Sequence, residues 1–148
     1  MAGRLVLRKT IAASPHEVFS FWTDAESMKS WMCPCGVVEA RARLDVRIGG
    51  SFEIVMKGPE GDLVHSGTYR VVDPPRKLVF TWTSAGTSDL PTLVTVEFLA
   101  QGRGTEVVLT HEDLPDDAAV ASHGNGWASI LDLLAARASA PGSGPPIY

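Results

Sequence analysis

The middle of the chain is a succession of short β-type runs, and this order of elements restricts the fold more than any other feature. Each run is rich in β-branched and aromatic residues and is bounded by Gly, Pro, Asp or Ser. The separators are short enough for antiparallel hairpins. The six predicted strands are 37–44, 51–56, 63–72, 77–83, 92–99 and 105–111.

A further strand and two short helices are predicted before this succession. The strand covers residues 4–12 and is followed by Ser14-Pro15-His16-Glu17. This motif is typical of a helix N-terminus, because the serine can cap, the proline can begin the helix and the glutamate completes a capping box. His16 is expected to face solvent. A second short helix is predicted over about 24–31.

The chain ends in one long predicted helix, from just after 114–117 to about 137. It contains His123-Gly124-Asn125-Gly126-Trp127, and each glycine in a helix interior costs about 1 kcal/mol. Such glycines indicate that a sheet backbone, or a ligand between helix and sheet, comes close. One apolar face has the helical spacing i, i+3, i+4 and i+7. Its residues are Trp127, Ile130, Leu131 and Leu134.

The predicted class is α+β. A seven-stranded curved antiparallel sheet, with two short helices after the first strand and a long C-terminal helix across its concave face, buries every apolar stripe. The length of 148 residues fits a single domain. We assign that domain to 1–138 and expect the Pro- and Gly-rich segment 139–148 to be a flexible tail.

Composition argues against several function classes. With 45% hydrophobic residues, a net charge of −4 and no dense Lys/Arg cluster, neither nucleic acid nor a membrane is an expected partner.

No signal peptide and no run of about 20 apolar residues is present, so the expected location is the cytoplasm. No Gly-x-Ser-x-Gly, Gly-x-Gly-x-x-Gly or His-Glu-x-x-His motif occurs, and no cofactor is expected. Monomer and homodimer both stay open.

The only two cysteines, Cys33 and Cys35, flank Pro34. A disulfide between them would close a very small, strained ring. A zinc site needs about four ligands, and no second cysteine pair or close histidine pair is present. We therefore predict free thiols and no metal site.

Several short motifs follow one another in a characteristic order over about residues 4–137. They are Ser14-Pro15-His16-Glu17-Val18-Phe19, Trp22-Thr23-Asp24, Trp31, Ile48-Gly49-Gly50-Ser51-Phe52, Gly67-Thr68-Tyr69, Pro74-Pro75-Arg76-Lys77-Leu78-Val79-Phe80-Thr81-Trp82, Gly104-Thr105-Glu106-Val107, Leu109-Thr110-His111 and Gly126-Trp127. In this order they resemble the activator-of-heat-shock-protein-90-ATPase homologue branch of the START-like (helix-grip, SRPBCC) superfamily. The resemblance implies a deep apolar cavity between the sheet and the long helix.

Strand parity predicts which side chains would line such a cavity, because alternate residues of a strand share a face. The same positions would also form an ordinary core, and a cavity well below about 300 Å³ would favour that interpretation. Trp22 and Trp31 are either rim residues or packing anchors. The predicted ligand-binding set is Trp22, Trp31, Phe52, Ile54, Met56, His65, Tyr69, Phe80, Trp82, Val94, Val96, Leu109, His111, His123 and Trp127.

Polar groups on this inner face are the most discriminating, because a buried polar atom needs a partner. His111, His123 and Tyr69 are the candidates for acid–base catalysis, and the two histidines are expected to meet near one cavity mouth. None is assigned a catalytic role, and whether the protein is an enzyme stays open. We favour binding of a hydrophobic or amphipathic small molecule. The resemblance implies two alternatives, a polyketide cyclase/aromatase-like or hydrolase-like enzyme and a chaperone-interacting co-factor.

Overall fold

The computed structural model describes residues 3–34 and 39–139, so Cys35 and the predicted tail beyond Ser139 lie outside the described residues. The predicted strands and α-helices follow one another in the order expected from the sequence. The elements are β1 (Gly3–Ile11), α1 (Pro15–Trp22), α2 (Ala25–Met28), β2 (Glu39–Leu44), β3 (Ser51–Gly58), β4 (Gly61–Asp73), β5 (Lys77–Trp82), the 3₁₀ helix η1 (Ala85–Thr87), β6 (Thr92–Gln101), β7 (Gly104–Leu114) and α3 (Asp117–Ser139).

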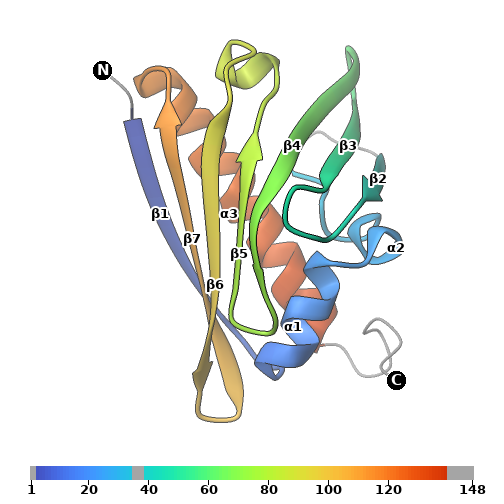
Figure 1. The fold of residues 1–148 in the computed structure, drawn as a ribbon, viewed down its shortest axis with the longest axis vertical. Helices are drawn as coiled ribbons and strands as arrows, with labels where there is room; N and C mark the ends of the chain where they lie inside the picture. The colour runs from blue at the N-terminus through green and yellow to red at the C-terminus, as the bar shows by residue number, and fades with distance from the viewer. Residues whose placement is uncertain (1–2, 35–38, 140–148) are drawn as a thin grey trace.

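The seven strands form one antiparallel sheet in the order β1-β7-β6-β5-β4-β3-β2. Consecutive strands from β2 to β7 are neighbours, and β1 pairs with β7. Helix α3 crosses one face of the sheet (Figure 1). The predicted α+β class and helix-grip arrangement are therefore confirmed.

The first helices begin where the sequence predicts. The Ser14 hydroxyl accepts a hydrogen bond from the backbone N–H of Glu17 at 3.2 Å, and Pro15 is the first residue of α1. The Asp24 carboxylate accepts from the N–H of Glu26 at 3.0 Å and caps α2. These side chains satisfy N–H groups that a helix terminus leaves without an intrahelical partner.

Several strands extend beyond their predicted ranges. The predicted loop over 58–62 shrinks to Pro59 and Glu60, because Gly58 and Gly61 still pair across the hairpin. Gly61 has φ of 127°, a conformation that favours glycine and makes so tight a connection possible. Strand β7 continues to Leu114, whose partner is Gly3 of β1. Sheet pairing thus extends beyond the stretches of clear apolar alternation.

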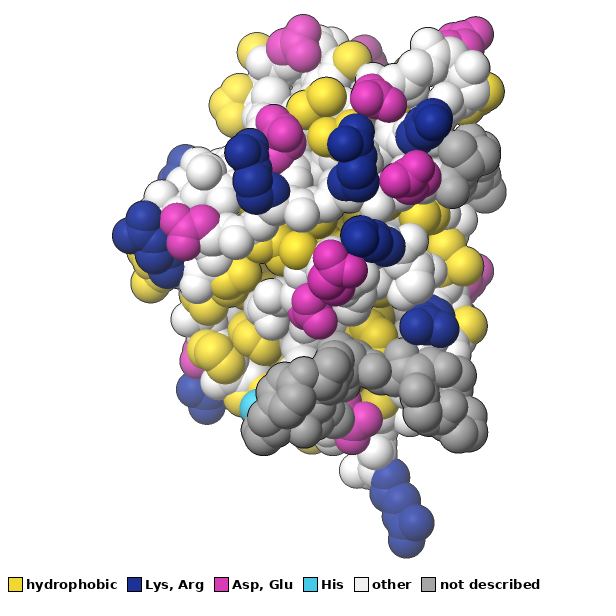
Figure 2. Space-filling view, turned by 90° about the vertical axis from the view of Figure 1, so that its right-hand side faces the viewer, with side chains coloured by type: hydrophobic (Ala, Val, Ile, Leu, Met, Phe, Trp, Pro, Cys, Tyr) yellow, Lys and Arg dark blue, Asp and Glu magenta, His cyan; other side chains and the backbone are white. Residues whose placement is uncertain are grey.

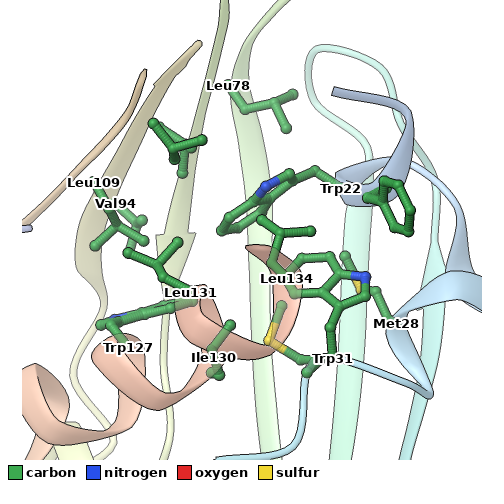
Figure 3. Packing of buried hydrophobic residues seen from close by; sticks show 14 of the residues in the cluster. Trp22, Met28, Trp31, Leu78, Val94, Leu109, Trp127, Ile130, Leu131 and Leu134 are labelled. Carbon is green, nitrogen blue, oxygen red and sulfur yellow. The ribbon is translucent and has the colours of Figure 1, made fainter. Parts of the chain in front are cut away.

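The core lies between the concave face of the sheet and the helices (Figure 3). Leu131 and Leu134 of α3 point toward the sheet and are 2% and 0% exposed. The Trp22 ring from α1 lies against Trp31, with ring centroids 4.8 Å apart in an edge-to-face arrangement. Burying each large apolar side chain contributes roughly 1.5–3 kcal/mol, so this layer is the main source of stability.

The surface carries both signs of charge. Figure 2 shows Lys and Arg side chains interspersed with Asp and Glu on the side of the molecule that carries the β2 edge. Among the described residues, no helix has the length and apolar character needed to cross a membrane.

Candidate functional site

A pocket of about 400 Å³ opens at one end of the groove between α3 and the sheet. Its walls come from the N-terminal half of α3, the β3–β4 hairpin, the end of β5 and η1. The volume falls in the range of small-molecule sites, roughly 300–1,000 Å³, and exceeds that expected of a filled core. The lining residues are Pro34, Met56, Asp62, Leu63, Val64, His65, Trp82, Ser84, Ala85, Gly86, Ser122, His123, Asn125, Gly126, Trp127 and Ile130.

The 3₁₀ helix fixes one wall of the pocket. The Ser84 hydroxyl accepts from the N–H of Gly86, and the Thr87 hydroxyl accepts from the N–H of Ser84. This reciprocal capping holds Gly86 against His123, where an added Cβ would lie 3.3 Å from the imidazole Cε1. A side chain at position 86 would therefore press on His123 and narrow the pocket.

The two glycines of α3 are not required by close packing against the sheet. Among the described residues, and apart from the backbone of α3 itself, a Cβ added at Gly124 would meet no atom within 4 Å, and one added at Gly126 would reach the side chain of Pro34, at 4.0 Å. Gly126 lines the pocket and Gly124 does not. The prediction that these glycines allow tight contact with a sheet backbone is thus wrong. Gly126 instead leaves room in the pocket that a side chain at this position would occupy.

His111 is part of a buried chain of hydrogen bonds that joins α3 to the sheet. The Trp127 indole N–H donates to His111 Nδ1 at 3.0 Å, and His111 Nε2 lies 2.7 Å from the Thr92 hydroxyl. That hydroxyl in turn donates to the carbonyl oxygen of Trp82 at 2.6 Å. Because Trp127 can only donate and the carbonyl can only accept, His111 must be the neutral tautomer with its proton on Nε2.

This environment makes His111 a structural residue. Its side chain is fully buried, and burial, assisted by the proximity of His123, lowers its pKa from 6.5 to about 3. Both ring nitrogens already have partners, so His111 has no nitrogen left for a substrate. The ring centroids of His111 and His123 are 5.0 Å apart, but only His123 lines the pocket.

His123 presents a hydrogen-bond acceptor to the pocket. Its Nδ1 lies 2.8 Å from the carbonyl oxygen of Ala119, which can only accept, so Nδ1 carries the proton of the neutral ring. The other nitrogen, Nε2, lies on the side of Gly86. A Cβ added at Gly86 would be 3.6 Å from this nitrogen. No described residue donates a hydrogen bond to Nε2, so a ligand hydroxyl or N–H group is a suitable partner.

His65 and Trp82 form the opposite, sheet-side wall. Their ring centroids are 4.9 Å apart with an interplanar angle of 33°, a tilted stack. Burial lowers the pKa of His65, and its Nδ1 lies 3.4 Å from the carbonyl oxygen of Ile54. The positive charge of a protonated His123 would lower the pKa of His65 further. At neutral pH this wall is therefore an uncharged aromatic surface.

The remaining part of the groove is filled by side chains. A second, inner void has a volume of only about 10 Å³ and lies within the aromatic core. Tyr69 lines it, is 3% exposed, and has its pKa raised to about 12, mainly by burial. Tyr69 thus lies apart from the pocket, and the three candidate catalytic residues are not brought together there. The inner void is lined by Trp22, Met28, Met32, Leu44, Phe52, Ile54, Tyr69, Leu78, Phe80 and Trp82.

The predicted ligand-binding residues fall into three groups. One group lines the pocket: Met56, His65, Trp82, His123 and Trp127. A second lines the inner void: Trp22, Phe52, Ile54, Tyr69 and Phe80, together with Trp82. A third lies in the core away from both: Trp31, Val94, Val96, Leu109 and His111. The structure makes Trp22 and Trp31 packing anchors, not rim residues, because they are 2% and 0% exposed.

Several pocket residues had no part in the predicted site. Ser84, Ala85 and Gly86 belong to a segment that the sequence marked only as a loop. A serine three residues before a threonine is a weak capping signal that could have placed a helical turn there. Leu63 and Val64 lie at the outer end of β4, where the sequence does not show that the hairpin folds over the groove.

The described residues offer no metal centre, since no three His, Cys, Asp or Glu side chains lie together among them. Cys33 has a free thiol, as predicted, and its Sγ lies 3.4 Å from the carbonyl oxygen of Lys29. Burial raises the pKa of this thiol, which makes it a weaker nucleophile at neutral pH.

Solved structures share this architecture. The chain resembles the AHSA1 protein of Silicibacter pomeroyi, with 27% identity, a TM-score of 0.75 and coverage of 90% of this chain and 96% of that one. CalU16 from Micromonospora echinospora is 26% identical, with a TM-score of 0.70 and coverage of 90% and 74%. A protein from Chromobacterium violaceum has a TM-score of 0.82 at 19% identity, covering 93% and 97%, which shows the fold alone.

The family comparison agrees with the resemblance inferred from the ordered motifs. A search among curated proteins finds no match. The model of the family described as activator of Hsp90 ATPase homolog 1-like protein matches residues 12–139, which include both short helices, six of the seven strands and the whole of α3. The chain belongs to this family.

Proposed function

We propose that the protein binds a small amphipathic molecule in the pocket between η1, the β3–β4 hairpin and α3. The observation that carries the proposal is the pocket of about 400 Å³, whose walls are mainly aromatic and aliphatic and to which His123 presents Nε2 as a hydrogen-bond acceptor. Burial of apolar surface at about 25 cal/mol per Å² supplies affinity without a charged anchor. The AHSA1-like fold commonly binds hydrophobic ligands, which supports the same interpretation.

The polar groups of the pocket restrict the ligand further. Because His123 Nδ1 is held by the Ala119 carbonyl, the neutral ring can only accept at Nε2. A ligand with a hydroxyl or N–H group beside an apolar body satisfies this nitrogen, while the body packs on Trp82 and Trp127. Phenols and hydroxylated polycyclic aromatics fit this description.

The proposal is tested by titrating the protein with a panel of fatty acids, simple aromatics, phenols and hydroxylated polycyclic compounds. A ligand at about 100 times its Kd stabilises the folded state by about 2.7 kcal/mol, which raises Tm by on the order of 5–10 °C for a chain of this length. Tryptophan fluorescence should change in parallel, since Trp82 and Trp127 line the pocket. A panel that leaves both Tm and fluorescence unchanged would contradict the proposal.

Two variants of α3 give a matched test of location. Gly126→Leu places a side chain in the pocket, and Gly124→Leu adds the same side chain two residues away, outside the lining. Both changes favour the helix. We expect the first to abolish the ligand-induced rise in Tm and the second to retain it. Equal binding by both variants would place the ligand elsewhere.

A further inference from the structure

Trp82 separates the pocket from the inner void. It is the one residue that lines both cavities among the described residues. Its ring stands between His65 and Trp127, with centroid distances of 4.9 and 5.0 Å. The face turned to the pocket meets a space of about 400 Å³, whereas the void behind it measures about 10 Å³, roughly the room that one water molecule needs.

The backbone of Trp82 is fixed, but its side chain makes no hydrogen bond to the part of the chain that the structure describes. Strand pairing with Thr92 and the hydrogen bond from the Thr92 hydroxyl hold the main chain. The indole N–H of Trp82, like that of Trp22, is buried and has no partner among the described residues. The indole of Trp127, in contrast, donates to His111 at 3.0 Å, and that of Trp31 donates to Ser27 at 3.3 Å. Packing alone therefore holds the Trp82 ring.

The region behind Trp82 is able to adapt. Met28 and Met32 line the inner void, and their unbranched side chains change shape at little cost. Leu44, also in this wall, is only partly buried at the β2 edge of the sheet. If the Trp82 ring turns toward the pocket, the volume it leaves joins the void and forms an apolar channel along the groove.

We infer that the Trp82 indole is a movable partition, and that an inner apolar subsite behind it accepts the flexible tail of an amphipathic ligand. This inference rests on the proposed function for the identity of the ligand, but the movement of Trp82 does not. The polar end of the ligand lies near His123, and an unbranched hydrocarbon tail enters the inner void, which Phe52 and Trp22 line.

Hydrogen exchange of the free protein tests the movement without any ligand. We expect the Trp82 indole N–H to exchange with deuterated solvent by local opening, at least about tenfold faster than the slowest backbone amides and with little dependence on denaturant. Spectra of Trp82→Phe assign the resonance. Exchange of Trp82 only at the rate of global unfolding, with the denaturant dependence of the slowest amides, would overturn the partition.

A series of 4-alkylphenols, from ethyl to dodecyl, tests the subsite. Wild-type affinity should rise by roughly fourfold per methylene and continue to rise for the longest tails. Leu44→Phe, which fills the inner void, should remove the gain for long tails and leave the short members unaffected. Short members that bind while long ones gain nothing would overturn the subsite and leave the proposed function intact. If no member binds, the subsite fails together with the proposed function, and the exchange measurement still decides whether Trp82 moves.

Discussion

The chemistry of each histidine in this protein is decided by what its two ring nitrogens contact. His111 has a donor on one side and a hydroxyl on the other, so it is satisfied and neutral. His123 has one nitrogen bound to a carbonyl and the other facing the pocket. His16, in the first turn of α1, is exposed as predicted. The same residue type is therefore fully buried and hydrogen-bonded at position 111, lines a pocket at position 123 and faces solvent at position 16.

The buried His111 makes stability depend on pH. Its pKa is about 3 in the folded protein and near 6.5 when unperturbed, so between these values the unfolded chain takes up a proton that the folded protein does not. The free energy of unfolding should therefore fall as pH falls from about 6.5 toward about 3, with a contribution of up to about 1.4 kcal/mol per pH unit. Urea denaturation at several pH values measures this slope.

The control for this experiment is a pair of substitutions. His111→Gln keeps an acceptor and a donor but cannot titrate, so its slope should be shallower than that of the wild type. His16→Gln, at an exposed position, is the matched substitution that also removes one histidine. His65, whose pKa burial also lowers, contributes a slope of the same sign that persists in both variants. An unchanged slope in His111→Gln would show that His111 is not the responsible group.

At the scale of elements, helix α3 combines two tasks that conflict. Its buried face holds the sheet through Leu131 and Leu134, while its N-terminal half carries glycines that weaken the helix. Gly126 has a reason in the pocket, which a side chain would fill. For Gly124 the described residues give no such reason, since none of their atoms outside the backbone of α3 lies within 4 Å of an added Cβ and Gly124 does not line the pocket.

Gly124→Ala should therefore stabilise the protein. Alanine is better than glycine in a helix interior by about 1 kcal/mol, and the added methyl group meets no atom of the described residues within 4 Å apart from the backbone of α3. Thermal unfolding should show a Tm higher by on the order of 2–4 °C. Ligand binding should be unaffected. A decrease in Tm would mean that α3 needs the glycine for a reason that its packing does not show.

At the scale of the molecule, burial and not ion pairing joins the helix to the sheet. The Lys9–Asp132 pair connects β1 and α3 at 2.7 Å, but the side chains are 36% and 69% exposed. Such a pair contributes at most about 1 kcal/mol. Leu134, on the same helix, is completely buried in the core that joins all layers.

Two substitutions compare these contributions directly. Leu134→Ala should reduce the free energy of unfolding by about 2–5 kcal/mol, because it removes buried surface and leaves a cavity. Lys9→Met should change it by less than about 1 kcal/mol. Chemical denaturation of both variants measures the difference. A larger loss for Lys9→Met than for Leu134→Ala would contradict the view that burial holds the two layers together.

The fold was predictable because its signals are local. Ser14 and Pro15 predict a helix N-terminus without reference to any distant residue. The alternation along 92–99 likewise predicts a strand without reference to the strands that pair with it. The alternation of side chains along each strand also placed Trp82 and His65 on the face of the sheet that is turned to α3. The strand ends were less predictable, since pairing between Gly58 and Gly61 depends on the partner strand and not on either residue's own preference.

The site was predictable only in part. Sequence parity indicates which side chains face inward, but not whether the space between them is empty. The inner face could be a cavity or a core along its whole length, and the structure divides it into a pocket of about 400 Å³ and a nearly filled interior. Likewise, nothing in the sequence shows that Trp127 and Thr92 take both nitrogens of His111.

By itself, then, the sequence determined the order of the elements, the antiparallel sheet and the inward set of side chains, because period, caps and turn residues act within a few positions. Only the tertiary structure decided that Gly126 borders a pocket, that His111 is structural and that Trp82 stands between two cavities. Those properties depend on how side chains from distant elements fill a shared volume, and packing density is a property of the assembled layers.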